Sequence, residues 1–311
     1  MSRPRETLFD NDAWAAARPR LSVLIPFLRD DPSRLLAALD REALDGQAEI
    51  VVLDDGSADE ALAEAVRAAV SALALPVRFV RLSANIGRAR GRNRLATHAR
   101  GEWYLFLDSD MLPDAPAFLA AYLSLIETEA PAVVFGGFSV RQAPQVRAHA
   151  LHRRMALKSD CAPAEVRRTA PEKHVFTSNL LVRREVFETE AFDEGFAGWG
   201  WEDVEWAMRV ARRHRIGHID NTATHLGLDP ARTIAAKYEQ SAANFARVVA
   251  RHREVVEHYP SYRAARLLKR VPLRGAWRPA LKAIALAEAA PLAARAFAMR
   301  LYRAALYAEA V

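Results

Sequence analysis

Short apolar segments alternate with helical segments along the first 110 residues, and this alternation restricts the fold more than any other feature. The predicted strands cover 21–27, 49–57 with its closing turn, 77–83 and 103–108, and the predicted helices cover 32–40, 58–74 and 87–100. Strands that alternate with helices in this way form parallel sheets with helices on both faces. The sequence therefore predicts an α/β protein with a Rossmann-like, mostly parallel central sheet.

The second half of the chain is less regular. We expect a strand at 132–140, a helix and a basic loop over 145–174, a strand at 176–187, an amphipathic helix at 201–215, and a strand with its turn at 216–229. From Pro230 onward the pattern is helical, with breaks expected near Pro260, Pro272, Pro279 and Pro291, because proline interrupts helices. A helical C-terminal extension is therefore predicted.

The composition is that of an ordinary globular protein with a sizeable core. Of the 311 residues, 51% are hydrophobic and 26% are charged. Cys161 is the single cysteine, which excludes an internal disulfide framework and fits a reducing compartment. The N-terminus lacks the apolar stretch of a secretory signal, and no uncharged apolar run reaches about 18 residues. A cytoplasmic location is the expectation.

Basic residues are concentrated at the C-terminus. Residues 261–311 contain ten Lys or Arg and two Glu, a net charge of +8, whereas the whole chain carries +6 and the first 260 residues therefore carry −2. The segment is also rich in Ala and Leu, and basic amphipathic helices bind anionic membrane surfaces. The alternative is that these helices pack on the body of the protein or on a second subunit of a homo-oligomer.

Four aspartates lie at the ends of predicted strands. Asp54 and Asp55 end the second strand, and Asp108 and Asp110 end the fourth, in the sequence FLDSDM. In parallel α/β sheets, ligands bind at the carboxyl ends of the strands. Two carboxylates one residue apart suit a hard cation, Mg²⁺ or Mn²⁺, bound jointly with a diphosphate.

Three other interpretations of these acids fit less well. A dinucleotide-binding fold needs G-x-G-x-x-G after the first strand, where this chain has PFLRDDPS. Phosphatases of the haloacid dehalogenase type have their D-x-D on the first strand rather than the fourth. An EF-hand needs further oxygen ligands and a closing Glu, which DSDMLPDAPAFL lacks.

The segment FAGWGWEDVEW, residues 196–206, is the most specific part of the sequence. Gly198 and Gly200 allow the backbone to approach a ligand closely. Trp199 and Trp201 offer flat apolar faces, which suit the C–H faces of a sugar. A buried core turn is the alternative explanation for this pattern.

Two acids and a histidine complete the candidate site. Glu202 and Asp203 fall in the first turn of a predicted helix, where the helix dipole favours acids whether or not they have a catalytic role. His225, in NTATHLGLD, is either a satisfied turn residue or a ligand of the suspected metal.

Five segments occur in the order typical of one family. LSVLIPF, VVLDDGSAD, NIGRARGRN, FLDSDM and GWGWED together resemble glycosyltransferase family 2, the inverting nucleotide-sugar transferases of GT-A fold. The last segment is similar to the Gly-Trp-Gly-x-Glu-Asp element of β-1,4-galactosyltransferases and bacterial chondroitin polymerases. The resemblance covers roughly residues 20–230.

The resemblance implies roles in a donor half, about residues 20–112. The implied donor-binding residues are Pro26, Asp54, Asp55, Arg88, Arg90, Asn93 and Asp108. Asp55, with Asp54, would bind the uracil of a UDP-sugar, and Asp108 would face the ribose or the donor sugar. Asp110 and His225 would bind Mn²⁺ or Mg²⁺.

In an acceptor half, about residues 130–229, Asp203 would be the general base. Glu202, Trp199 and Trp201 would bind the acceptor. Trp201 stands where the family often has a small residue, so a narrower acceptor site is expected.

The expected protein is thus a metal-dependent inverting glycosyltransferase. It would move a sugar from UDP to a hydroxyl of a glycan or lipid-linked acceptor, in bacterial surface polysaccharide synthesis, and no nucleic-acid partner is expected. Residues 1–229 would form the GT-A domain and 230–311 the basic helical extension. The alternative is a catalytically inactive sugar-nucleotide-binding or assembly module with the same fold.

Overall fold

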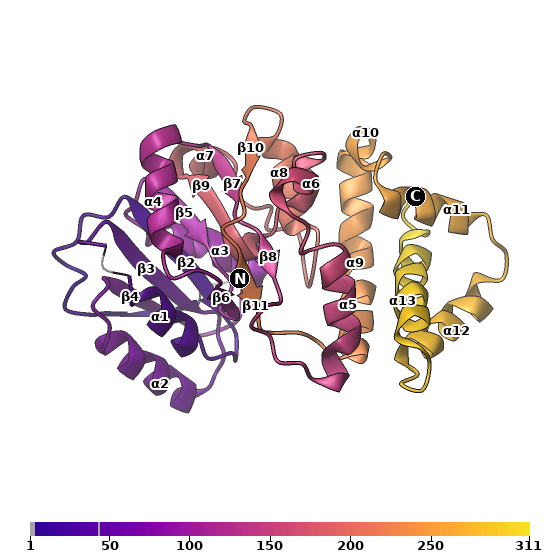
Figure 1. Ribbon diagram of the computed structural model, residues 1–311, viewed down its shortest axis with the longest axis horizontal. Helices are drawn as coiled ribbons and strands as arrows, with labels where there is room; N and C mark the ends of the chain where they lie inside the picture. Colours follow the sequence, from indigo (N-terminus) through magenta and orange to yellow (C-terminus); the bar gives the residue numbers. More distant parts are fainter. Residues whose placement is uncertain (1–3, 43) are drawn as a thin grey trace.

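The computed structural model describes residues 4–42 and 44–311, so the first three residues of the expected domain 1–229 lie outside it. A mixed sheet of eight strands forms its centre (Figure 1). The strands are β1 (Glu6–Asp10), β2 (Leu21–Phe27), β3 (Ala48–Asp54), β4 (Val77–Leu82), β5 (Trp103–Phe106), β7 (Val133–Phe135), β9 (Leu180–Arg183) and β10 (Ile216–His218). Their order in space is β1-β4-β3-β2-β5-β9-β7-β10.

The parallel part of the sheet is the part that the sequence predicts. β2 pairs in parallel with β3 and β5, β3 pairs in parallel with β4, and β7 pairs in parallel with β10. β9 is antiparallel to both of its neighbours, and β1 is antiparallel to β4. β3 is buried along its whole length, which explains the apolar run from Ile50 to Leu53. The expected α/β class is confirmed.

Helices cover both faces of this sheet. The helices on one face are α1 (Ser33–Leu39), α2 (Glu60–Ser71) and α4 (Phe118–Glu129), and those on the other are α3 (Arg88–Ala96), α7 (Arg184–Thr189) and α8 (Glu202–Val210). Side chains of β5 alternate between the two cores: Leu105 packs in the first, and Tyr104 and Phe106 pack in the second. The sheet therefore lies between two apolar layers, and the carboxyl ends of its strands are the places where a ligand-binding site can form.

A second, small sheet lies beside the carboxyl end of β5. It consists of β6 (Met111–Pro113), β11 (Ala223–His225) and β8 (Phe138–Ser139), in the order β6-β11-β8. β6 and β11 run antiparallel, with His225 opposite Met111. This pairing brings the end of the second half of the chain next to the Asp108–Asp110 segment.

The C-terminal helices form a third layer beyond α8. They are α9 (Ala231–Arg251), α10 (Arg253–Val256), α11 (Pro260–Lys269), α12 (Arg274–Leu286) and α13 (Leu292–Tyr307). Earlier in the chain, the remaining helices are α5 (Ala150–Lys158), α6 (Ala164–Arg167) and the short 3₁₀ turns η1 (Arg147–His149), η2 (Pro171–His174) and η3 (Thr177–Asn179). Met299 of α13 shares a core with Leu151 of α5, and Phe245 of α9 shares one with Met208 of α8. The predicted helical extension is therefore packed on α5 and α8. Within the described residues, no helix combines the length and the apolar character needed to span a bilayer.

Three sequence predictions of secondary structure are wrong in detail. The segment 132–140 is two strands, because Gly136 and Gly137 separate β7 from β8, and Gly137 has a φ of +106°. In 176–187 only β9 is a strand, and α7 begins directly after it. Pro279 lies inside α12 and does not break it. Proline has no N–H to donate to the carbonyl four residues earlier, at Gly275, but Gly275 is exposed and water can bond to that carbonyl instead. The other three prolines lie between or at the starts of helices, as predicted.

Candidate active site

Asp108 lies just beyond β5 and is held by two arginines of α3. Arg92 Nη2 donates to Asp108 Oδ1 over 2.7 Å, and Arg88 Nη2 lies 3.8 Å from Asp108 Oδ2. Burial raises the pKa of Asp108, yet the charges of Arg92 and Arg88 outweigh burial and hold the pKa below its usual value. Asp108 is therefore ionised at neutral pH.

Asp110 and His225 meet across the small sheet. The distance from Asp110 Oδ2 to His225 Nε2 is 3.0 Å. Burial lowers the pKa of His225, but the hydrogen bond and charge of Asp110 outweigh it and raise the pKa. A Cβ at Gly227 would meet the Asp110 carboxylate, so the glycine leaves that carboxylate room in its present position beside His225. The two segments are thus built to bring these donor atoms together.

This pair fits two ligands of a hard cation. The Asp110 carboxylate and the His225 imidazole lie within 3.0 Å of each other, so the two side chains could hold one cation together. In the described part of the chain, no three His, Cys, Asp or Glu side chains are grouped as metal ligands. The remaining ligands would have to come from water and a diphosphate, as is usual for Mg²⁺ sites.

Glu202 and Asp203 begin α8 and face the same arginines. Arg88 Nε donates to Glu202 Oε1 over 2.9 Å, and Arg92 Nη1 lies 3.6 Å from the same oxygen. Arg92 and Arg88 therefore bridge Asp108, at the end of β5, to Glu202, at the start of α8. The sequence predicts both acidic segments, and the structure brings them to one place.

Asp203 has the protonation behaviour of a base that works near neutral pH. Burial, followed by the charge of Glu202, raises the pKa of Asp203 to about 7, against the opposing charges of Arg92 and Arg88. Its Oδ1 accepts a hydrogen bond from the Val204 N–H over 2.9 Å. A carboxylate with a pKa near the working pH is suited to accept a proton.

Asp55 shapes the loop between β4 and α3. Its Oδ1 accepts from the Ile86 N–H over 2.9 Å, and its Oδ2 accepts from Asn85 Nδ2 over 3.0 Å and from the Gly87 N–H over 3.2 Å. Burial raises the pKa of Asp55 to about 6. Asp55 therefore links the end of β3 to the loop that leads into the arginines of α3.

Asp54 and Pro26 lie at the same edge of the sheet. Asp54 Oδ1 accepts from the Ser57 N–H over 2.7 Å, and its Oδ2 lies 3.5 Å from Arg81 Nε, so Asp54 closes a buried turn. Pro26 is half-buried near the end of β2, in register with Leu53 of β3.

Arg90 and Asn93 point to a different segment. Asn93 Nδ2 donates to the Phe192 carbonyl over 2.9 Å, and the Phe192 N–H donates to Asn93 Oδ1 over 3.0 Å. Arg90 Nε lies 3.3 Å from Glu194 Oε2, and both side chains are about half exposed. The structure does not bring either residue to the carboxylates described above, and their contribution to donor binding stays a prediction.

Trp199 and Trp201 pack toward the C-terminal helices. The Trp201 ring lies 4.9 Å from that of Phe245, and its Nε1 donates to Tyr307 Oη over 2.9 Å. The Trp199 ring lies 6.1 Å from that of Tyr238. These contacts give both indoles a packing role, and their contact with an acceptor stays a prediction.

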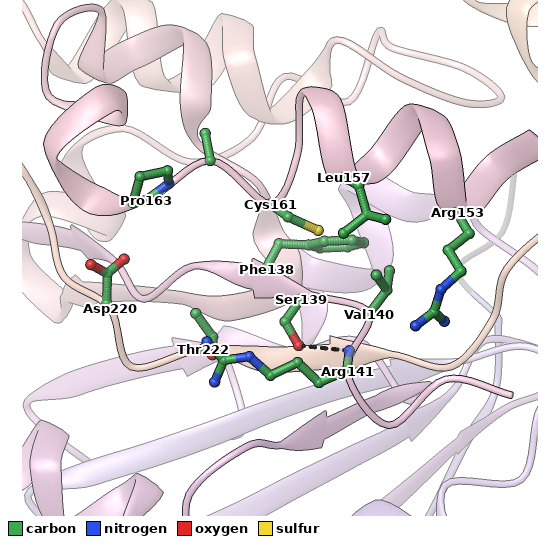
Figure 2. Close-up of a pocket in the computed structure, with 11 residues that line it drawn as sticks. Phe138, Ser139, Val140, Arg141, Arg153, Leu157, Cys161, Pro163, Asp220 and Thr222 are labelled. Atoms are coloured by element: carbon green, nitrogen blue, oxygen red, sulfur yellow. Dashed lines mark hydrogen bonds between the residues drawn. The ribbon is translucent and has the colours of Figure 1, made fainter. Parts of the chain in front are cut away.

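A cavity of about 410 Å³ lies beside the small sheet (Figure 2). Phe138, Leu157 and Cys161 gather on one side of it, and Arg141 and Arg153 also line it. No residue that the sequence predicts for the site lines this cavity. It adjoins the Asp110–His225 pair through Phe138, whose ring lies 5.1 Å from that of His225.

Four charged residues around the site are not predicted from the sequence. Arg92 is 2% exposed and lies in the GRARGRN segment, where its burial has no sequence signal. Asp30 follows β2 at the same sheet edge, and burial, then the charge of Asp110, raises its pKa. The other two of these four residues are Lys237 and Asp229, which form an ion pair with 2.6 Å between Nζ and Oδ2. The position of Asp30 after the first strand was a usable signal.

Solved structures with a similar fold support the GT-A-like architecture. The mannosyltransferase PcManGT from Pyrobaculum calidifontis, in complex with GDP-Man and Mn²⁺, is 18% identical with a TM-score of 0.61, over 93% of this chain and 86% of that chain. S. aureus TarS, in complex with UDP-GlcNAc, is 18% identical with a TM-score of 0.51, over 91% and 89%. At these identities the likeness shows the fold alone, and it confirms the fold that the sequence predicts.

Sequence comparisons give the family. An uncharacterized glycosyltransferase of Bacillus subtilis, YfnE, is 36% identical over 124 residues, which are 38% of this chain and 30% of that protein. The chain spans about a third of the length of the curated relatives it matches. The model of glycosyl transferase family 2 matches residues 22–190, and the Gly-Trp-Gly element lies beyond that match. Because the match covers more than half of the chain, this protein belongs to glycosyl transferase family 2.

Proposed function

We propose that this protein is a glycosyltransferase that transfers a sugar from UDP to a hydroxyl of a glycan or lipid-linked acceptor, with Mn²⁺ or Mg²⁺ and with inversion. The observation that carries the proposal is the meeting of the Asp108–Asp110 segment, His225 and the Glu202–Asp203 pair at one edge of the sheet. Two proteins of similar fold were solved with nucleotide sugars, PcManGT with GDP-Man and Mn²⁺ and TarS with UDP-GlcNAc, and this supports a nucleotide-sugar donor for the present protein.

In this proposal the donor lies along the carboxyl ends of β2, β3 and β5. Asp55 accepts a hydrogen bond from the uracil, and Asp108, kept ionised by Arg92, accepts one from the ribose or the donor sugar. Asp110 and His225 hold the cation. When bound, the ion supplies positive charge that neutralises the departing diphosphate.

The acceptor approaches from the start of α8. Glu202, fixed by Arg88, accepts a hydrogen bond from the acceptor, and Asp203 takes the proton from the attacking hydroxyl. A single displacement at the anomeric carbon then inverts its configuration. The pKa of Asp203, about 7, leaves a large fraction of this base ionised at neutral pH.

Thermal melting with UDP and UDP-sugars, with and without Mn²⁺, tests the metal and donor assignments. The melting temperature of the wild-type protein should rise with nucleotide, and rise further when Mn²⁺ is present. Asp110→Ala should lose the Mn²⁺-dependent part of the shift while melting cooperatively. Asp12→Ala, which removes an exposed carboxylate outside the site, is the matched control and should behave as wild type.

An unchanged Mn²⁺-dependent shift in Asp110→Ala would show that the metal assignment is wrong. Release of UDP from the donor, measured in the same samples, separates the two classes left open by the sequence. A donor that binds with Mn²⁺ and is never hydrolysed or transferred would favour the inactive binding module.

A further inference from the structure

Large apolar side chains are exposed on the C-terminal helices. In the described part of the chain, five of the ten exposed large hydrophobic residues fall between 267 and 297. The most exposed of them are Leu273, at 80%, and Leu267, at 66%. Exposed apolar side chains gathered in one region mark an interaction surface.

The exposed face of α11 combines these side chains with arginines. Tyr262 and Ala265 are buried and attach the helix to the body. Arg263, Arg266 and Leu267 are exposed, and they lie next to one another because residues three and four apart are neighbours on a helix surface. Arg270 continues that face directly after the helix, and it too is exposed.

Three apolar residues form the tip of this region. Leu267 lies on α11, and Val271 and Leu273 lie in the turn that joins α11 to α12. Leu273 has a φ of +57°, a backbone conformation that glycine or asparagine adopts at lower cost. Figure 1 shows this turn at the edge of the molecule, on the far side from α1 and α2. The tip can therefore contact a flat surface without obstruction from the body.

The positive charge of this face is not neutralised by the protein. Arg263, Arg266 and Arg270 form no ion pair with any described residue, whereas elsewhere in the extension Arg278 lies 2.6 Å from Glu309 and Lys282 lies 2.6 Å from Glu239. On α13, Tyr302 and Tyr307 are buried, and Phe297 is exposed. Three unpaired arginines therefore lie beside the apolar tip.

We propose that α11 and the turn after it dock on an anionic lipid bilayer. Leu267, Val271 and Leu273 enter the interface, and Arg263, Arg266 and Arg270 contact the headgroups. An interfacial helix has this combination of apolar and basic residues. A second copy of this chain would bring the same unpaired arginines against each other, so charge favours the lipid surface over self-association.

Flotation with vesicles tests this docking surface. The full chain should float with vesicles that contain phosphatidylglycerol, more weakly at high salt, and should not float with phosphatidylcholine alone. Each arginine near an anionic surface strengthens binding about fivefold, so R263Q/R266Q/R270Q should weaken binding about 100-fold. L267S/V271S/L273S should weaken it by at least about tenfold. Point variants are preferred to truncation at Pro260, which would uncover the cores shared with α13.

Matched variants outside α11 and the turn after it are the controls. R5Q/R34Q/R41Q removes three exposed arginines, and L8S/V166S removes two exposed apolar side chains. Both should bind vesicles as the wild type does, and circular dichroism should show every variant folded. The proposal is overturned if the full chain does not float with anionic vesicles at low salt, or if the control arginine variant loses as much binding as the α11 variant. It is also overturned if the apolar tip instead drives a concentration-dependent dimer without vesicle binding.

Discussion

Arg92 connects the two acidic segments of the site. It is 2% exposed, it donates to Asp108 over 2.7 Å, and it lies 3.6 Å from Glu202. Buried carboxylates are costly unless a cation compensates them. Arg92 therefore positions both segments, although it need not touch either substrate.

Replacing Arg92 with methionine should strongly destabilise the protein. The variant keeps the length of the side chain and leaves Asp108 without its nearest cation, and breaking a buried ion pair in this way costs about 3–5 kcal/mol of unfolding free energy. Arg90→Met, on an exposed neighbour, should cost about 1 kcal/mol or less. Denaturant unfolding measures both values. Equal small losses in the two variants would show that Arg92 has no such role.

The site could be predicted only where its residues have a sequence pattern. Asp108 and Asp110 follow a buried strand, and this pattern predicts their place at the sheet edge. The direction of Trp201 could not be predicted, because it depends on a φ of +77° and on contact with Tyr307, which is far away in the sequence. Arg92 was missed since nothing local distinguishes a buried arginine from an exposed one.

Strands and helices, too, could be predicted where a local sequence pattern marks them, and could not where distant contacts decide them. β2 to β5 follow from apolar runs and turns. β1 was missed because it is an edge strand whose side chains are mostly exposed, and its place is decided by pairing with β4. β9 ends earlier than its apolar sequence suggests, because α7 begins at Arg184 and packs Phe187 into the core. Tertiary contacts decide these boundaries.

The start of α8 is fastened to α13 through one tyrosine. Tyr307 Oη accepts from Trp201 Nε1 over 2.9 Å and lies 2.8 Å from Ser241 Oγ. Tyr307→Phe keeps the ring and removes both hydrogen bonds, so it should lower the unfolding free energy by about 1–3 kcal/mol. Tyr262→Phe is the control, since this tyrosine is also buried and the structure shows no hydrogen bond from its hydroxyl. If both variants melt at the wild-type temperature, Tyr307 does not fasten α13 to α8.

Across the whole molecule, the positive charge is concentrated in the C-terminal extension, and the candidate site is acidic. The first 260 residues carry −2 and hold the acidic site, and the last 51 carry +8 and expose unpaired arginines on α11. α3 and α8 meet through Arg88 and Glu202, and the C-terminal helices pack behind α8. In our proposals, this arrangement lets the extension approach a lipid surface while the sheet edge binds the donor.

The proposed chemistry is tested most directly by measuring how the rate of donor hydrolysis depends on pH in the wild type and in Asp203→Asn. In this reaction water takes the place of the acceptor. In the wild type, burial and Glu202 raise the pKa of Asp203 to about 7, so the rate should fall as the pH drops below about 7 and the base becomes protonated. Asp203→Asn should lower the rate about 10²–10⁴-fold, abolish that pH dependence, and leave the Kd of the donor nearly unchanged. A variant that keeps the wild-type rate and pH profile, or that loses donor affinity instead of rate, would contradict the role of Asp203 as the base.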